Sequence, residues 1–130
     1  MVNDSIADFL ARIKNNIHRQ KNEVIVPFNK KLEAIAQILK KEGFILDYKI
    51  EGKGIKKNII LMLKYVNGVS AIRDLKRISK PGVRIYVGYK DIPRVMGGTG
   101  IAIISTPDGI LTGKEAKKRH IGGEFWCKIW

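Results

Sequence analysis

The sequence is poor in cysteine and has no long apolar run. Cys127 is the only cysteine in 130 residues, which excludes an internal disulfide, and no Cys/His cluster is present to hold zinc. No apolar run approaches the roughly 20 residues that a membrane-spanning helix needs. The first residues, "MVNDSIADF", lack the basic and apolar segments of a signal peptide. These absences predict a soluble, intracellular protein without a structural metal.

Acidic residues are also scarce. The chain has 12 Asp and Glu against 25 Lys and Arg, for a net charge of +13 and a pI near 10.0. Such an excess favours polyanionic partners, with nucleic acid ahead of an anionic membrane. Residues 1–70 hold 13 basic and 7 acidic side chains, and residues 71–130 hold 12 and 5. Because the excess is divided almost equally, folded surfaces rather than a basic tail must carry it.

Residues 1–66 contain two segments with apolar residues at helical spacing and three strand-like runs. Ser5 and Asp8 resemble a capping box for the first helix, and Asn29 is placed to cap the second. The run that contains Pro27 fits an edge strand or a strand end. We expect an α-β-α-β-β domain.

An Asn67-Gly68 turn follows, and residues 69–130 have a different pattern. Short apolar runs alternate with glycine-containing turns, and "GKEAKKRH" predicts one short basic helix. We therefore expect an α+β protein of two small lobes, residues 1–66 and a mainly β lobe over residues 69–130.

The stretch "MGGTGIAIISTPDGILTG", residues 96–113, raises the possibility of a nucleotide-dependent enzyme. A Walker loop would require glycine at Asp108, and Gly113-Lys114 is followed by glutamate. A dinucleotide fingerprint would require glycine at Ile103 and a helix after the glycines, where a strand is expected. Ser105 lies in no nucleophile elbow. The sequence favours a non-catalytic protein without a cofactor.

Basic and aromatic residues alternate in "KPGVRIYVGYK". On a strand, Arg84, Tyr86, Gly88 and Lys90 would share one face. A cationic and aromatic face suits phosphate contact and base stacking. A solvated strand face with a half-buried tyrosine explains the pattern equally well.

Four other features fit RNA binding but also have plainer explanations. "STPDG" offers hydroxyls and a tight turn, although a simple hairpin explains it better on turn chemistry alone. Lys117 and Lys118 on the short helix, and Lys30 and Lys31 at a helix N-terminus, could contact phosphate or only aid solubility. The pair Gly122-Gly123 could admit an RNA backbone or end the helix.

A longer pattern resembles a known family. In order, its members are Gly100, Ile103-Ile104, Ser105-Thr106, Gly109, Ile110-Leu111 and Ala116-Lys117. This spacing resembles the signature of the bacterial-type small-ribosomal-subunit protein eight family (uS-eight). The segments "DSIADFLARIKN" and "ILKKEGFI" are also similar to that family, so the resemblance covers nearly the whole chain.

The resemblance implies a structural protein of the small (30S) subunit that binds the central domain of 16S rRNA and aids assembly. It further implies contacts with neighbouring ribosomal proteins, protein five first among them, and repression of its own operon mRNA. The expected location is the cytoplasmic ribosome of a bacterium or an organelle, with a monomer outside the ribosome. A stand-alone RNA-binding regulator with the same surface is the main alternative.

The resemblance also implies which residues contact rRNA. The family's Ser-Thr-Ser loop corresponds to Ser105, Thr106 and position 107, where this chain has Pro107 and so lacks one hydroxyl and one backbone donor. Its Gly-Gly-Glu segment corresponds to residues 122–124. The predicted RNA-binding residues are Ser105, Thr106, Pro107, Gly109, Gly122, Gly123, Glu124, Arg84, Tyr86, Lys117, Lys118, Lys30 and Lys31.

Overall fold

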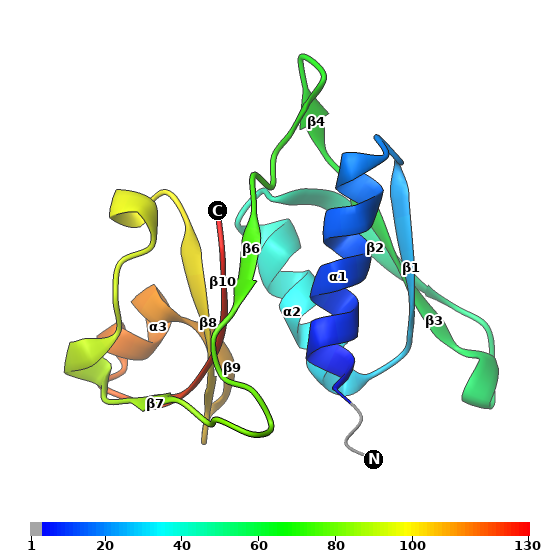
Figure 1. Ribbon diagram of the computed structural model, residues 1–130. Coiled ribbons are helices and arrows are strands. Elements are labelled where there is room, and N and C mark those ends of the chain that lie inside the picture. The colour runs from blue at the N-terminus through cyan, green and yellow to red at the C-terminus, as the bar shows by residue number, and fades with distance from the viewer. Residues whose placement is uncertain (1–3) are drawn as a thin grey trace. The chain divides into compact units, whose positions relative to one another are not determined.

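A computed structural model of the chain describes residues 4–130, which form two compact units. The first unit is Asp4–Arg73, and the second contains Asp74–Trp130 (Figure 1). The division after Arg73 assigns the hairpin around Asn67 to the first unit. Helices and antiparallel strands occur in both, so the predicted α+β class is confirmed.

The first unit packs two helices on one face of a three-stranded sheet. Its elements are α1 (Ser5–His18), β1 (Glu23–Pro27), α2 (Lys30–Lys41), β2 (Ile45–Glu51), the 3-10 turn η1 (Gly54–Lys56), β3 (Asn58–Leu63), β4 (Tyr65–Val66) and β5 (Val69–Ser70). The sheet order is β1-β3-β2, with antiparallel neighbours. Alternate β3 residues, Ile59 and Leu61 among them, are fully buried, as the helix-facing side of such a sheet requires.

Local side-chain bonds set where both helices begin. The predicted capping box on Ser5 and Asp8 is wrong by one residue, because Asp4 accepts a 3.1 Å hydrogen bond from the Ala7 N–H. Asp8 instead pairs with Arg12 one turn later, at 2.9 Å. The prediction for α2 is confirmed, since the Asn29 side chain accepts from the Lys31 N–H at 2.8 Å.

Strand β1 lies at an edge of the sheet, as Pro27 predicted. Its outward carbonyl groups are bonded by α1: Arg12 donates to the Ile25 oxygen at 3.0 Å, and Asn16 donates to the Glu23 oxygen at 2.8 Å. These bonds protect the edge from pairing with another strand. The Asn67-Gly68 turn is confirmed, with φ of 53° and 78° at the two residues between β4 and β5.

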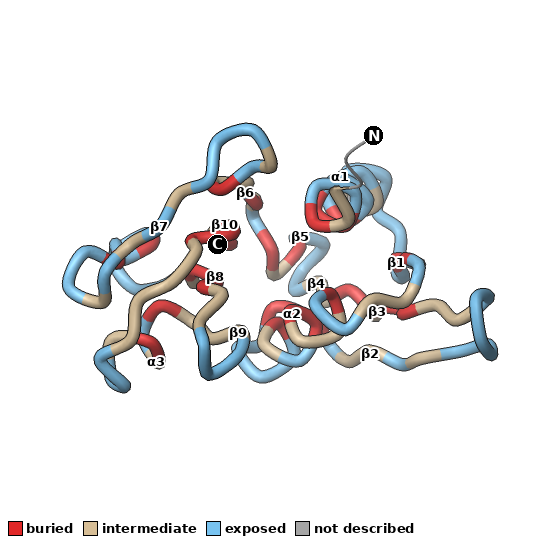
Figure 2. The backbone as a smooth tube through the Cα atoms, turned by 90° about the horizontal axis from the view of Figure 1, so that it is seen from below, coloured by how far each residue is buried: buried red, intermediate tan, exposed pale blue. Residues whose placement is uncertain are grey.

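The second unit is built around a central strand near the end of the chain. Its elements are β6 (Leu75–Arg77), β7 (Tyr86–Val87), the 3-10 turns η2 (Tyr89–Asp91) and η3 (Met96–Gly98), β8 (Ile101–Thr106), β9 (Gly109–Thr112), α3 (Gly113–Lys118) and β10 (Gly123–Ile129). The sheet order is β6-β10-β8-β9, and β7 also pairs with β10. Figure 2 shows buried residues concentrated on β8 and β10, with exposed connecting loops.

Two local predictions for this unit are wrong. The strand expected to carry Arg84 through Lys90 contains only Tyr86 and Val87, because the chain turns into η2 directly afterwards and removes Lys90 from the face. The helix α3 ends before Gly122-Gly123: its C-cap is Arg119, and His120 has a positive φ of 56°. Gly123 begins β10 instead.

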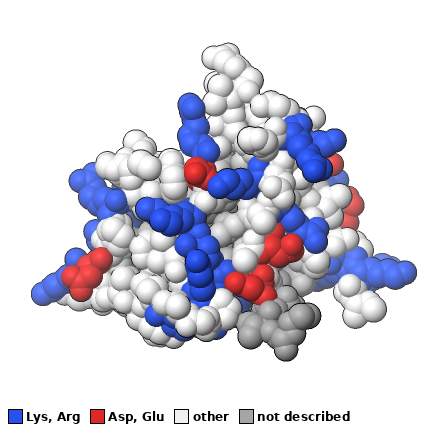
Figure 3. All heavy atoms as spheres, viewed as in Figure 1, with Lys and Arg blue, Asp and Glu red and all other residues white. Residues whose placement is uncertain are grey.

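Lys and Arg side chains are distributed over much of the surface seen in Figure 3, whereas Asp and Glu form small groups. Among residues 4–130, no helix has the length and apolar character to cross a membrane. The same residues include no group of three or more His, Cys, Asp or Glu side chains placed to hold a metal ion.

Candidate nucleic-acid interface

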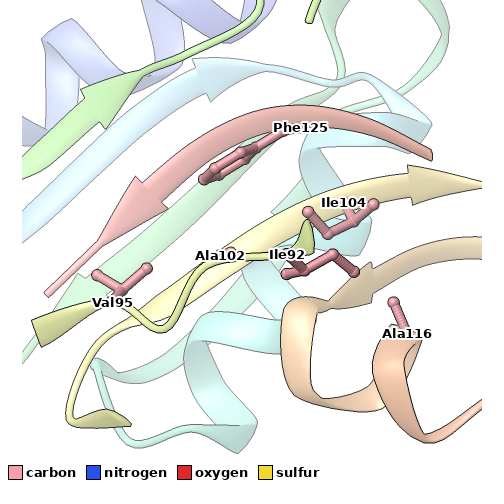
Figure 4. Close-up of a cluster of buried hydrophobic side chains, with 6 residues drawn as sticks. All are labelled: Ile92, Val95, Ala102, Ile104, Ala116 and Phe125. Carbon is pink, nitrogen blue, oxygen red and sulfur yellow. The ribbon is translucent and has the colours of Figure 1, made fainter. Parts of the chain in front are cut away.

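A small hydrophobic core holds α3 against the sheet of the second unit. Its buried members, drawn in Figure 4, are Ile92, Val95, Ala102, Ile104, Ala116 and Phe125. Phe125 of β10 is paired with Ile104 of β8, which is paired with Leu111 of β9. Because side chains alternate along a strand, the preceding residue of β10 and the following residue of β8 face the opposite side.

On that opposite side, three strands bring candidate residues into one row. Glu124 of β10 is paired with Tyr86 of β7 and with Ser105 of β8. Paired residues of antiparallel strands project to the same face, so the Glu124 side chain lies between that of Tyr86 on one side and that of Ser105 on the other. Tyr86 is 70% exposed and Ser105 is half-buried. We refer to Tyr86, Glu124 and Ser105 as the cross-strand row.

Ser105 and Thr106 use their hydroxyl groups differently. The Thr106 hydroxyl donates to the Gly109 carbonyl oxygen at 2.7 Å and accepts from the Asp108 N–H at 3.1 Å. The Ser105 hydroxyl has no hydrogen bond to any residue that the structure describes. Of the two predicted hydroxyl contacts, Thr106 therefore shapes the turn, while Ser105 is available to a partner.

Pro107 and Gly109 suit the same tight turn. Pro107 is exposed at the first central position, where a fixed φ is compatible and no backbone N–H is required. Gly109 has a φ of 113°, which other residues rarely adopt. The turn is joined to α3 through Arg119, which lies 3.7 Å from the Asp108 carboxylate and 3.0 Å from that of Glu115.

The lysines of α3 lie on the helix that packs against the other face of the sheet, so the structure does not bring them onto the face of the cross-strand row. Thr112 caps the helix by accepting from the Glu115 N–H at 3.1 Å. Lys118 is exposed and Lys117 is half-buried, so both ammonium groups can reach solvent through flexible stems.

The pair Gly122-Gly123 is required by the packing of the sheet itself. A Cβ at Gly122 would collide with the Val87 carbonyl oxygen, and one at Gly123 would collide with the Ser105 carbonyl oxygen. The two glycines thus let β10 enter between β7 and β8. This close approach of protein strands accounts for both residues without an RNA backbone.

Glu124 is surrounded by hydrogen-bond donors from its own chain. One carboxylate oxygen, Oε2, accepts from the Ser79 hydroxyl at 2.6 Å and from Arg84 Nη1 at 2.9 Å. The other oxygen, Oε1, accepts from Trp126 Nε1 at 3.0 Å. Burial by itself would raise the pKa of Glu124, but the hydrogen bonds from Ser79, Trp126 and Arg84 outweigh burial and lower it. Glu124 is therefore an ionised carboxylate held inside a donor network.

Arg84 and Ser79, both bonded to Glu124, differ in their exposure to solvent. Arg84 is half-exposed, with 49% of its side chain accessible, and its guanidinium has further N–H donors besides the one bonded to Glu124. Ser79 is fully buried and was not predicted from the sequence. Its role depends on Glu124, 45 residues later, and no local pattern around "RISKPG" signals that pairing.

Lys30 and Lys31 occupy the first turn of α2 in the other unit and are exposed. The Lys31 N–H is already bonded to the Asn29 side chain, which reduces the donors available to an anion there. Cys127 is fully buried in β10, and burial raises its pKa to about 12. It remains a neutral thiol, as expected for a small apolar residue.

Comparison with known proteins agrees with the sequence motifs. Residues 4–130 match the model of the family described as ribosomal protein S8. A relative from Mycoplasmopsis pulmonis, named small ribosomal subunit protein uS8, is 53% identical over 130 residues, which cover 100% of this chain and 98% of the relative. Proteins of the same name from Trichodesmium erythraeum and Spiroplasma kunkelii are 52% and 50% identical, covering 98% and 100% of each chain respectively. The chain therefore belongs to the ribosomal protein S8 family, as its sequence signature predicted.

Proposed function

We propose that this protein is a structural component of the small ribosomal subunit that binds the central domain of 16S rRNA through its second unit. The observation that carries the proposal is the unbonded Ser105 hydroxyl on the same face of the sheet as the exposed Tyr86 ring, with Glu124 of the cross-strand row between them. The family membership supports a ribosomal role.

The chemistry of the row suits an irregular RNA helix. A serine hydroxyl can donate to and accept from base edges and 2′-hydroxyl groups. An exposed tyrosine provides a surface on which a base can stack. Arg84, Lys117 and Lys118 add phosphate contacts, which supply affinity without sequence information. Specificity then resides in the row, and most of the salt-dependent affinity resides in the cations.

Substitution of Ser105 tests this proposal directly. We expect Ser105→Ala to weaken binding to a central-domain 16S rRNA fragment about tenfold, the effect of losing one hydrogen bond of about 1.4 kcal/mol. The slope of log affinity against log salt should not change, because no charge is removed. Filter binding or calorimetry at three salt concentrations measures both quantities.

Thr99→Ala is the matched control, since the Thr99 hydroxyl is exposed in the same unit but already donates to the Met96 oxygen at 2.7 Å. It should leave RNA affinity unchanged. Equal affinities of Ser105→Ala and the unaltered protein for the central-domain fragment, or equal binding to a 5′-domain fragment, would refute the proposed site.

The family resemblance supports the remaining assignments. These are a cytoplasmic, ribosome-bound location, contact with ribosomal protein five, a monomeric state outside the ribosome, and repression of the protein's own operon mRNA. If the mRNA presents the same RNA shape, the central-domain fragment should compete with it for the protein. Independent binding of the two RNAs would separate the repressor role from the ribosomal site.

A further inference from the structure

The polypeptide between β6 and β7 is fastened at both ends to the start of β10. The Ile78 and Ser79 N–H groups donate to the carbonyl oxygens of Trp126 and Phe125, each at 3.0 Å. On the return, the Phe125 N–H donates to the Ile85 oxygen at 3.0 Å. Between these points the chain reverses at residues 80–83, where Lys80 and Val83 exchange two backbone hydrogen bonds of 3.0 Å. We call residues 79–85 the 79–85 loop.

Side chains add a second set of bonds at the same place. The Ser79 hydroxyl donates to Glu124 at 2.6 Å and accepts from the Ile85 N–H at 3.1 Å, so one buried oxygen links both ends of the loop to the carboxylate. Arg84 reaches the same carboxylate oxygen at 2.9 Å. Glu124 thus binds both ends of the loop that leads directly into Tyr86.

This arrangement leaves little of Glu124 for an outside partner. Its side chain is 15% exposed, and three donors occupy a carboxylate that offers about four acceptor positions. An anionic residue would also be repelled by RNA phosphates unless a cation neutralised it, and Arg84 fills that role. The position that the family resemblance assigns to RNA contact is occupied by contacts within the protein.

We propose that Glu124 is a positioning residue for RNA binding and not an RNA ligand: through Ser79 and Arg84 it holds the 79–85 loop so that Tyr86 stays on the same face of the sheet as Ser105, across β10 from it. This inference rests on the proposed function of the cross-strand row and identifies what orders it. Ser79 contributes although it is fully buried and cannot touch RNA. Glu124 keeps its internal partners when RNA is bound.

A double-mutant cycle tests the indirect action of Glu124. We expect Ser79→Ala and Glu124→Gln each to weaken binding to the central-domain fragment about five- to tenfold, and the double variant to be no weaker than the weaker single variant. Affinity for a non-cognate RNA of equal length should not fall, because such binding depends on charge. Neither substitution removes a cation, and Glu124→Gln removes a negative charge. A general folding defect would instead lower both affinities.

Ile92→Val is the matched control, because it shortens a buried side chain of the same unit that lies outside the Glu124 network. It should leave both RNA affinities unchanged. Additive losses in the double variant, or full cognate affinity in Ser79→Ala, would show that Glu124 does not act through Ser79 and would overturn the inference. If Ser105→Ala instead binds the central-domain fragment as tightly as the unaltered protein, the proposed function is refuted. The two proposals therefore fail on different variants.

A spectroscopic experiment does not depend on the folding of these variants. Trp126 Nε1 donates to Glu124 at 3.0 Å, so the emission maximum of Trp126 reports the state of that carboxylate. In a Trp130→Phe protein, which retains Trp126 as its one tryptophan, adding the central-domain fragment should leave the emission maximum in place. A shift on RNA binding would show that Glu124 leaves Trp126 for the RNA, and would overturn the inference.

Discussion

The two units carry similar positive charge but display it differently. The net charge is +6 over residues 1–70 and +7 over residues 71–130. In the first unit, exposed lysines lie at the start of α2 and in the loop between β2 and β3. In the second unit, β7, β8 and β10 bring an aromatic ring, a free hydroxyl and a bonded carboxylate together. Both units thus carry charge that favours polyanionic partners, and in the second unit the charge accompanies hydroxyl and aromatic groups of the kinds through which proteins contact RNA.

The largest expected effect comes from the close approach of strands in the second unit. Gly123→Ala should lower the free energy of unfolding by about 3 kcal/mol and remove specific RNA binding, because its Cβ would meet the Ser105 carbonyl oxygen. Urea titration and RNA binding measure the two losses. Gly82→Ala is the control, since Gly82 is exposed and a Cβ there meets no atom within 4 Å. Equal stability of the two variants would contradict the structural reason for Gly123.

The next largest expected effect is the loss of stability on removing a carboxylate, which should differ between Glu124 of the second unit and Asp47 of the first. Glu124→Ala should cost about 2 kcal/mol of stability, because it leaves the buried Ser79 hydroxyl and the Trp126 indole without their partner. Asp47→Ala should have no measurable effect: its pKa is lowered, first by the hydrogen bond from Lys40, but the pair is exposed to solvent. Thermal unfolding of both variants tests the difference.

The sign of the pH dependence follows from the lowered pKa of Glu124. A carboxylate whose pKa falls on folding stabilises the native state above its unfolded pKa, near 4.5, and this contribution is lost as the pH drops through the lower folded value. The stability difference between the unaltered protein and Glu124→Gln should therefore be constant above about pH 5.5 and shrink below about pH 4.5. A difference that grew in acid would contradict the donor network.

The smallest expected effect is on the salt dependence of RNA affinity, and it should differ between the lysine pairs of the two units. Lys117→Ala with Lys118→Ala should reduce the slope of log affinity against log salt by about 1.5, as expected for two lost phosphate contacts, without changing the preference for cognate RNA. The paired variant Lys30→Ala with Lys31→Ala is the comparison. An equal reduction there would show that the first unit also contacts RNA, and that the functional contrast between the units is weaker than the geometry suggests.

Much of the first unit could be predicted from sequence because its signals are local. The Asn29 cap, the Pro27 edge strand and the Asn67-Gly68 turn each depend on residues within about four positions. The wrong prediction of a cap at Ser5 is also a local error of one position, since Asp4 is an equally good capping residue. Boundaries of this kind are the least certain part of a prediction from sequence.

The candidate site could be predicted only in part. The hydroxyl pair Ser105-Thr106 is visible in the sequence, yet nothing local distinguishes the free hydroxyl from the one that closes the turn. The expected face with Arg84 and Lys90 failed because pairing with β10 stops at Val87. Strand length here depends on a partner nearly 40 residues away.

By itself, the sequence determined the family, the excess positive charge, the α+β class and the elements whose caps and turns are local. The tertiary structure decided which polar groups are free and which are bonded. It placed Ser79 beside Glu124, forced glycine at position 123 and brought Tyr86 and Ser105 onto one face, on either side of Glu124. The physical reason is that register between distant strands, together with alternation of side chains along each strand, selects the face on which a residue lies.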